Sequence, residues 1–191
     1  MSITFAPDSR NRTELLAQIK AKAVVHGRVT LSSGREADFY IDLRRVGLDG
    51  GAAPLVGRVM LELVRDLDFD AVGGLTLGAD PVAAAMLHAA AAQPELAGGR
   101  KLDAFVVRKS EKAHGLQQRI EGPDIAGRRV LIVEDTSTTG GSPLTAVEAA
   151  RAAGAEVIAV AVIVERGAQP AIDAAGLPYY AAYSLSDLGL A

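Results

Sequence analysis

The sequence predicts an α/β fold in which a central, mostly parallel sheet is flanked by helices. Continuous apolar runs at residues 71–74, 104–107 and 130–133 are typical of strands buried on both faces. Segments with helical spacing alternate with such runs, and this alternation indicates a parallel sheet covered by helices. With 191 residues, 49% of them hydrophobic, the chain can bury one substantial core, so we expect a single domain.

The elements follow from their spacing along the chain. We expect an opening amphipathic helix at 12–25, with Thr13 as its cap, and then two extended pieces within 29–44 joined by a tight turn at Ser33-Gly34. Further helices are expected at 55–67, 81–92, 143–153 and 170–175, and further strands at 157–164 and 179–183. The polar segment 108–127 shows no period, and long loops in compact domains are usually functional or disordered.

Composition excludes several classes of protein. The chain has no cysteine, so disulfides, thiolate nucleophiles and thiolate metal sites are excluded, as fits a reducing cytoplasm. The first residues lack a secretory signal, and no apolar stretch is long enough to span a membrane. A net charge of −3 gives no general attraction to nucleic acid or membranes. We therefore expect a cytoplasmic protein without either partner, whose anion binding depends on local clusters.

The most informative segment runs from Val130 to Pro143, where a buried strand leads into two carboxylates, then hydroxyls and glycines, then a helix. Ligands of open parallel sheets bind beyond the carboxyl ends of strands, where the next helix presents unpaired N–H groups. Thr136 to Ser142 can therefore wrap a phosphate, with Pro143 at the first helical position. Glu134 and Asp135 need another partner, either sugar hydroxyls or a cation such as magnesium.

The alternatives for this segment are few. It lacks the glycine-rich sequence motif of a dinucleotide-binding loop and the sequence motif of a P-loop. A polar turn that only caps a helix is the plainer interpretation, but ordinary turns between a strand and a helix are shorter and carry fewer polar side chains. A ribose that carries a phosphate satisfies both halves of the segment.

A second cluster is basic and begins where the strand at 104–107 ends. Arg108, Lys109, Lys112 and His114 bring three cations and one titratable ring into an otherwise acidic protein. Preorganised cations can stabilise the charge that gathers on a departing pyrophosphate. The alternative is a solvated charged loop, which is common for an isolated run.

The segment Val130–Ser142 resembles the phosphoribosyl pyrophosphate (PRPP) signature of type I phosphoribosyltransferases, although Thr136 and Ser137 depart from the apolar residues usual there. Arg-Lys-x-x-Lys-x-His-Gly at 108–115 resembles the mobile catalytic loop of the orotate phosphoribosyltransferases. The resemblance covers the chain from about residue 25 and implies the type I phosphoribosyltransferase fold, with about 1–45 as a small hood and about 46–191 as the core. It also implies a homodimer in which the basic loop covers the site of the neighbouring subunit.

The resemblance assigns the site residues as follows. The PRPP-binding residues would be Arg108, Lys109, Lys112, His114, Glu134, Asp135, Thr136, Ser137, Thr138, Thr139, Gly140, Gly141 and Ser142. Of these, Lys112, His114 and Asp135 would be catalytic. Magnesium would be the cofactor, bound through PRPP rather than directly by the protein.

The base would be held at the other end of the site. Phe39 and Tyr40 lie in a segment similar to the one that covers the pyrimidine in this family, although alternating aromatics in a strand also suit plain core packing. Arg166 resembles the family's arginine for the orotate carboxylate, and Thr138 would touch the same base. The family often has lysines where this chain has Ser32 and Gly78, so pyrophosphate binding would depend more on the loop and on backbone N–H groups.

The implied reaction joins orotate to the phosphoribosyl group and yields orotidine 5′-phosphate and pyrophosphate in UMP biosynthesis. It needs no protein nucleophile, so the enzyme contributes positioning and electrostatics. Two alternatives share the fold: a purine phosphoribosyltransferase, which should lack the basic loop and Arg166, and a noncatalytic nucleotide-sensing regulator, which should have a basic face or an added DNA-binding domain.

Overall fold

The computed structural model describes residues 2–30, 36–110 and 119–191. Among them, seven strands form the central sheet in the order β1-β9-β8-β7-β4-β5-β6. Their bounds are Thr4–Phe5 (β1), Ala71–Leu75 (β4), Asp103–Val107 (β5), Ile120–Glu121 (β6), Arg129–Ser137 (β7), Glu156–Glu165 (β8) and Tyr179–Tyr183 (β9). Neighbouring strands are parallel except for β5 and β6, so the mostly parallel sheet is confirmed.

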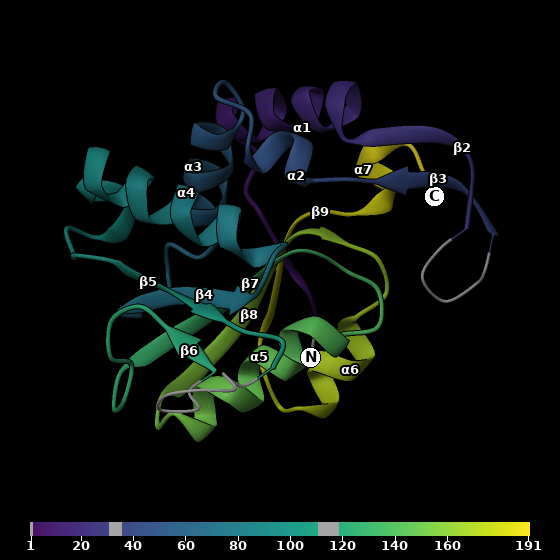
Figure 1. Ribbon diagram of the computed structural model, residues 1–191. Helices are drawn as coiled ribbons and strands as arrows, with labels where there is room; N and C mark the ends of the chain where they lie inside the picture. The colour runs from purple at the N-terminus through teal and green to yellow at the C-terminus, as the bar shows by residue number, and fades with distance from the viewer. Residues whose placement is uncertain (1, 31–35, 111–118) are drawn as a thin grey trace.

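Helices cover both faces of this sheet (Figure 1). One face packs against α1 (Arg10–Lys22), α3 (Ala53–Leu63) and α4 (Ala79–Ala92), together with the short α2 (Arg44–Gly47), η1 (Pro94–Ala97) and α7 (Leu185–Leu188). The other face packs against α5 (Gly141–Ala152) and α6 (Gln169–Ala174). The apolar side chains therefore form two cores, one on each side of the sheet, with the apolar run of β7 contributing to both. None of the described helices is both long and apolar enough to cross a membrane.

A separate two-stranded hairpin extends beyond the main sheet on the right of Figure 1. It consists of β2 (Val24–Thr30) and β3 (Glu36–Ile41), which pair antiparallel. The expected turn at Ser33-Gly34 and the departure at Ser32 lie outside the described residues. Because β3 leads directly into α2, residues 40–44 are carried to the carboxyl-terminal edge of the central sheet.

The opening helix starts earlier and ends earlier than expected. Ser9, not Thr13, is its cap: the Ser9 hydroxyl accepts a hydrogen bond from the Arg12 N–H at 3.0 Å. Val24 and Val25 belong to β2, because they pair with Ile41 and Tyr40 in the hairpin and β-branched side chains suit that setting. His26 likewise lies in β2.

The expected boundary between strand and helix in the segment 130–143 is also wrong. Strand β7 continues to Ser137, so Glu134 to Ser137 are strand residues rather than part of a loop. Helix α5 begins at Gly141, which puts Pro143 third in the helix instead of first. Proline is tolerated there because the N–H groups of the first turn have no partner within the helix.

Candidate functional site

The site begins with two adjacent carboxyl groups at the end of the central strand β7. Glu134 is only 4% exposed, and its Oε1 accepts a hydrogen bond from the Asp135 N–H at 3.1 Å. Asp135 Oδ1 accepts from the Thr136 N–H at 2.7 Å. Burial, and then the negative charge of Asp135, raise the pKa of Glu134 to about 8, and burial also raises the pKa of Asp135. Both effects favour the protonated form of the pair.

The loop that follows β4 faces this pair. It runs from Thr76 to Gly78, contains a cis peptide bond between Thr76 and Leu77, and leads into α4. The Thr76 hydroxyl donates to Asp80 Oδ2 at 2.7 Å, so the first turn of α4 is tied to the loop. Asp80 also contributes negative charge that raises the pKa of Glu134.

The predicted phosphate cradle forms the turn between β7 and α5. Thr138 and Thr139 are exposed, and Gly140 is the N-cap of α5 with a φ of 80°, in the left-handed region that favours glycine. Gly141 and Ser142, both exposed, occupy the first turn, where backbone N–H groups lack partners within the helix and suit an anion; the Gly141 N–H donates to the Thr139 hydroxyl at 3.5 Å. Ser137 differs from the others, because its side chain is buried and its carbonyl accepts from the Arg166 N–H at 3.0 Å.

Arg166 follows β8 and reaches toward the hairpin. Its guanidinium lies over the Phe39 ring, 5.9 Å from the ring centre. Its Nε is buried and has no hydrogen-bond partner among the described residues. Phe39 also packs against the core, as the plainer interpretation of this aromatic expects, whereas Tyr40 is 36% exposed.

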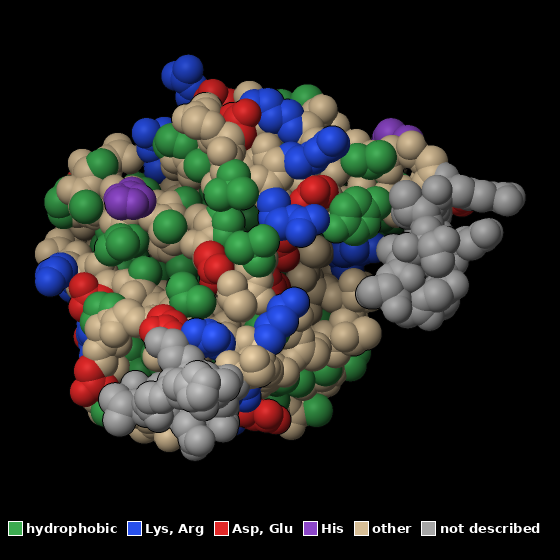
Figure 2. Space-filling view, in the orientation of Figure 1, with side chains coloured by type: hydrophobic (Ala, Val, Ile, Leu, Met, Phe, Trp, Pro, Cys, Tyr) green, Lys and Arg blue, Asp and Glu red, His purple; other side chains and the backbone are tan. Residues whose placement is uncertain are grey.

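A cavity of about 270 Å³ joins these parts. It is lined by Tyr40, Ile41, Asp42, Arg44, Leu75, Thr76, Leu77, Gly78, Lys109, Glu134, Asp135, Thr136, Ser142 and Arg166. The structure thus brings together residues of the cradle, the basic segment and the hairpin, which are far apart in the sequence. Figure 2 shows acidic and basic side chains gathered on the face between the two grey segments.

Not every predicted residue is found in the lining of this cavity. Lys112 and His114 fall outside the described residues. Arg108 lies beside the cavity rather than in its lining, and its Nη1 donates to Glu121 Oε1 on β6 at 3.3 Å. Asp42 and Arg44 also line the cavity, although no sequence motif points to them; their only signal in the sequence is a position shortly after the aromatic pair.

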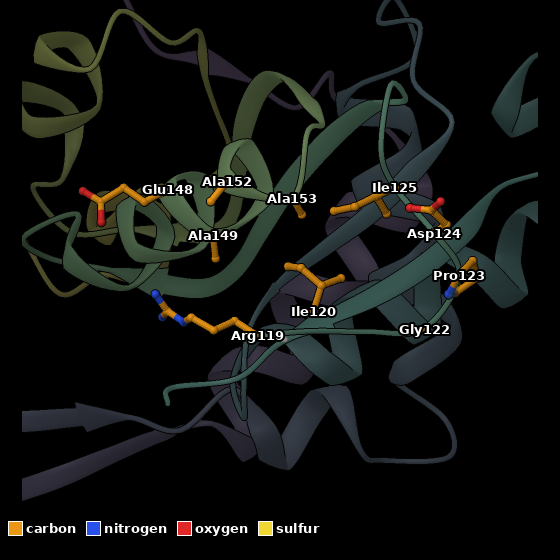
Figure 3. Close-up of a pocket in the computed structure, with 10 residues that line it drawn as sticks. All are labelled: Arg119, Ile120, Gly122, Pro123, Asp124, Ile125, Glu148, Ala149, Ala152 and Ala153. Carbon is orange, nitrogen blue, oxygen red and sulfur yellow. The ribbon is translucent and has the colours of Figure 1, made fainter. Parts of the chain in front are cut away.

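Two larger cavities contain none of the predicted site residues. One, of about 720 Å³, lies between helix α5 and the segment from Arg119 to Ile125, and Figure 3 shows Arg119 and Ile120 facing the α5 residues Glu148 and Ala149. The other, of about 480 Å³, is a mainly apolar groove between α2, α3 and α4. Of these three cavities, the smallest is the one that the predicted site residues line.

Comparisons with known proteins show the family to which the chain belongs. The phosphoribosyl transferase domain family matches residues 46–175, and together with the fold and the cradle this match defines the chain as a phosphoribosyltransferase. An orotate phosphoribosyltransferase of Streptomyces avermitilis is 72% identical over 182 residues, which are 94% of this chain and 97% of the relative.

Solved structures give the same result. The crystal structure of the Mycobacterium tuberculosis orotate phosphoribosyltransferase with Fe(III) dicitrate superposes with a TM-score of 0.83 at 56% identity, covering 94% of this chain and 99% of that one. The same enzyme with PRPP gives a TM-score of 0.79 at 51% identity, again covering 94% and 99%. The chain belongs to the orotate phosphoribosyltransferase family of pentosyl-transferring enzymes.

Proposed function

We propose that the chain transfers the 5-phosphoribosyl group from PRPP to orotate, giving orotidine 5′-phosphate and pyrophosphate in UMP biosynthesis. The observation that carries the proposal is one cavity that is lined by the carboxylate pair, two residues of the phosphate cradle and Arg166. The relatives of the same name and the PRPP complex of one of them support it.

The PRPP end of the site would work through three groups. Residues 136–142 would hold the 5-phosphate with the N–H groups and hydroxyls at the start of α5. Glu134 and Asp135 would accept hydrogen bonds from the ribose hydroxyls. Lys109 lines the cavity and would, with Arg108, Lys112 and His114, face the pyrophosphate.

Magnesium fits this site through the substrate. The described residues contain no group of three or more histidine and carboxylate side chains that could hold a metal ion. Glu134 and Asp135 are nevertheless hard oxygen donors, and such donors suit magnesium that keeps its water and phosphate ligands. When bound to PRPP, magnesium would offset the charge of the pyrophosphate.

The base end would hold orotate by its flat ring and its carboxylate. Arg166 has an unpaired buried Nε, and an arginine in this state favours a bidentate carboxylate ligand. Phe39 lies beside that guanidinium, so a ring bound there would meet an aromatic face, and Tyr40 and Thr138 would complete the contacts. A purine would offer no carboxylate to Arg166.

The reaction would proceed without a nucleophile from the protein. The orotate ring nitrogen would attack the anomeric carbon as the bond to pyrophosphate breaks, and the sugar would pass through an oxocarbenium-like state. The residues of the cavity would position the two substrates and stabilise the charge of the leaving group. Closure of the basic loop, with Lys112 and His114, would exclude water from the reacting centre.

We further propose a cytoplasmic homodimer that shares its basic loops, each subunit being one domain with residues 1–45 as hood and 46–191 as core. The apolar groove between α2, α3 and α4 supports association with a second copy, as does Leu48 on its rim, which is 71% exposed. The family match beginning at residue 46 supports the division between hood and core. The absence of cysteine fits the cytoplasm.

The proposed reaction is tested by mixing the purified protein with PRPP, magnesium and each of orotate, adenine, guanine and uracil, and following base consumption. We expect orotate to be consumed only when magnesium is present. Consumption of a purine instead would reassign the function within the fold class, and no reaction with any base would favour a nucleotide sensor.

Loop sharing is tested by mixing two inactive variants, Lys112→Ala and Asp135→Asn, after partial denaturation and refolding. In a shared-loop dimer, a mixed pair has one complete site, so random assembly should restore about a quarter of the original activity. Activity that stays at the level of the separate variants would show that each subunit uses its own loop.

A further inference from the structure

Arg44 is a basic residue of the cavity that the proposed mechanism does not yet use. It is the first residue of α2, directly after the hairpin strand β3, and its side chain is 44% exposed. Its guanidinium is oriented by two hydrogen bonds: Nε donates to Asp42 Oδ1 at 2.7 Å, and Nη2 donates to the Tyr40 hydroxyl at 3.3 Å. Both partners also line the cavity, so the plane of the guanidinium is fixed at its wall.

The charge of Arg44 acts on the carboxylate pair. Arg44 lowers the pKa of Asp135, opposing the larger raising effect of burial, and Asp135 in turn contributes to the raised pKa of Arg44, whose main cause is its hydrogen bond with Asp42. The other two cations that line the cavity are Lys109 and Arg166. Residues 75–81, which form the facing loop and the start of α4, contain no cation.

The positions of Arg166 and Arg44 indicate which of two anions, the orotate carboxylate or the diphosphate, each arginine would meet. Arg166 lies over Phe39, at the end proposed for orotate. Arg44 instead lines the cavity together with Asp135, which is proposed to hold the ribose hydroxyls, and its charge lowers the pKa of that carboxyl. In PRPP the diphosphate is attached to the carbon next to one of those hydroxyls, so the anion nearest Asp135 is the diphosphate rather than the orotate carboxylate.

We infer that Arg44 is a substrate-binding residue that contacts the diphosphate of PRPP, with Asp42 and Tyr40 as the residues that position it. An arginine has five N–H donors, and the two hydrogen bonds found here leave the Nη1 group for a phosphate oxygen. This inference rests on the proposed function, because it assigns one group of the substrate to one residue of the same site.

The neighbouring arginine provides a matched control. Arg45 is also exposed and lies in the same turn of α2, but it does not line the cavity, and its Nη1 donates to the Lys22 carbonyl at 3.3 Å. Substitution of either arginine by glutamine removes one positive charge from the same surface. Only Arg44→Gln should remove a contact with the diphosphate.

The experiment measures the binding of magnesium pyrophosphate by calorimetry, and the KM values for PRPP and orotate, in the unmutated protein, Arg44→Gln, Arg44→Lys and Arg45→Gln. We expect Arg44→Gln to weaken pyrophosphate binding and raise the KM for PRPP about tenfold, since hydrogen bonds to charged groups contribute that much. The KM for orotate should change less than about twofold, and Arg45→Gln should match the unmutated protein. Arg44→Lys should give intermediate values of both quantities, because lysine keeps the positive charge but lacks the planar set of N–H donors of arginine.

Two results would overturn the inference: equal pyrophosphate affinity in Arg44→Gln and the unmutated protein, or equal losses in Arg44→Gln and Arg45→Gln. A selective rise in the KM for orotate would reassign Arg44 to the base and would also overturn it. If Arg44→Gln fails to fold, Arg44→Lys and Asp42→Asn decide by the same readouts. Failure of the proposed function would appear separately, as an unmutated protein that binds magnesium pyrophosphate but does not consume orotate.

Discussion

Gly78 lies directly against the carboxylate pair: a Cβ on this residue would be 2.5 Å from Glu134 Oε1 and 2.8 Å from Asp135 Oδ1. A real Cβ does not approach oxygen atoms this closely, so the absence of a side chain at Gly78 lets the loop after β4 close over the end of β7. The wall of the cavity and the position of its carboxylates therefore depend on each other.

Replacing Gly78 with alanine should displace both carboxylates. We expect kcat/KM for PRPP to fall by about tenfold or more, with a loss of stability of about 1–3 kcal/mol, the range typical of overpacking. Steady-state kinetics and thermal melting measure the two effects. Gly50→Ala is the control, because a Cβ there would meet no atom within 4 Å. An unchanged kcat/KM in Gly78→Ala would mean that catalysis tolerates a different placement of the pair.

The raised pKa of Glu134 predicts how stability depends on pH. Its pKa rises from an ordinary 4.5 to about 8, so between these values the folded state holds a proton that the unfolded state has released. Stability contributed by this group is therefore complete below about pH 4.5 and is lost progressively as pH rises toward about 8. The Glu134→Gln variant has no ionisable group at this position, so it should not lose stability in this way as pH rises.

We therefore expect Glu134→Gln to melt at nearly the same temperature as the unmutated protein at pH 5 and several degrees higher at pH 8. Its activity should be low throughout, because a neutral amide replaces an anion proposed to hold ribose hydroxyls. Melting curves recorded at both pH values give the comparison. If the difference in melting temperature between Glu134→Gln and the unmutated protein became smaller toward pH 8, this result would contradict a raised pKa for Glu134.

The sheet and the carboxylate pair were predictable because local sequence determines them. The continuous apolar run of Val130 to Val133 suits only a strand buried on both faces, and the polar residues after it had to lie at the sheet's carboxyl end. Periodicity gave no indication of β1, β6, α2 or α7, which have two to four residues each. Such short elements form because neighbours are already in place, as when β6 pairs with β5.

Other features depend on contacts between distant residues. Ser9 caps α1 instead of Thr13, and its hydroxyl also donates to Glu62 Oε2 at 2.7 Å, a partner 53 residues away. Arg44 enters the site because the hairpin delivers it to the cavity, which no spacing in the sequence reveals. Sequence therefore pointed to the residues that follow sheet strands and to the aromatic pair Phe39 and Tyr40 of the hairpin, and missed Asp42 and Arg44, which follow β3.

Arg166 should determine the choice of base. We expect Arg166→Gln to raise the KM for orotate about tenfold to a hundredfold, because a buried charged donor then no longer meets the carboxylate. The KM for PRPP should change little. The ratio of kcat/KM for orotate to that for uracil, which lacks the carboxylate, should fall by a similar factor. Arg166→Lys keeps the charge and should retain part of the preference, whereas an unchanged ratio in Arg166→Gln would assign the carboxylate to another residue.

Gly140 and Gly176 allow backbone strain to be separated from the effect on the phosphate site. Both have φ values in the left-handed region, 80° and 71°, but a Cβ at Gly140 would lie 2.9 Å from the Ala171 Cβ, whereas a Cβ at Gly176 would meet nothing within 4 Å. Alanine at either position should cost about 1 kcal/mol from backbone strain, and Gly140→Ala should cost more because of the contact.

Only Gly140→Ala should also affect substrate binding, because Gly140 is the N-cap of α5 and sets the direction of the N–H groups proposed to hold the 5-phosphate. We expect its KM for PRPP to rise about tenfold while Gly176→Ala keeps the original value. Urea denaturation and steady-state kinetics on both variants separate the two effects. If the KM for PRPP rose equally in both, the loss would follow from general destabilisation, and the assignment of the cradle to the 5-phosphate would lose its support.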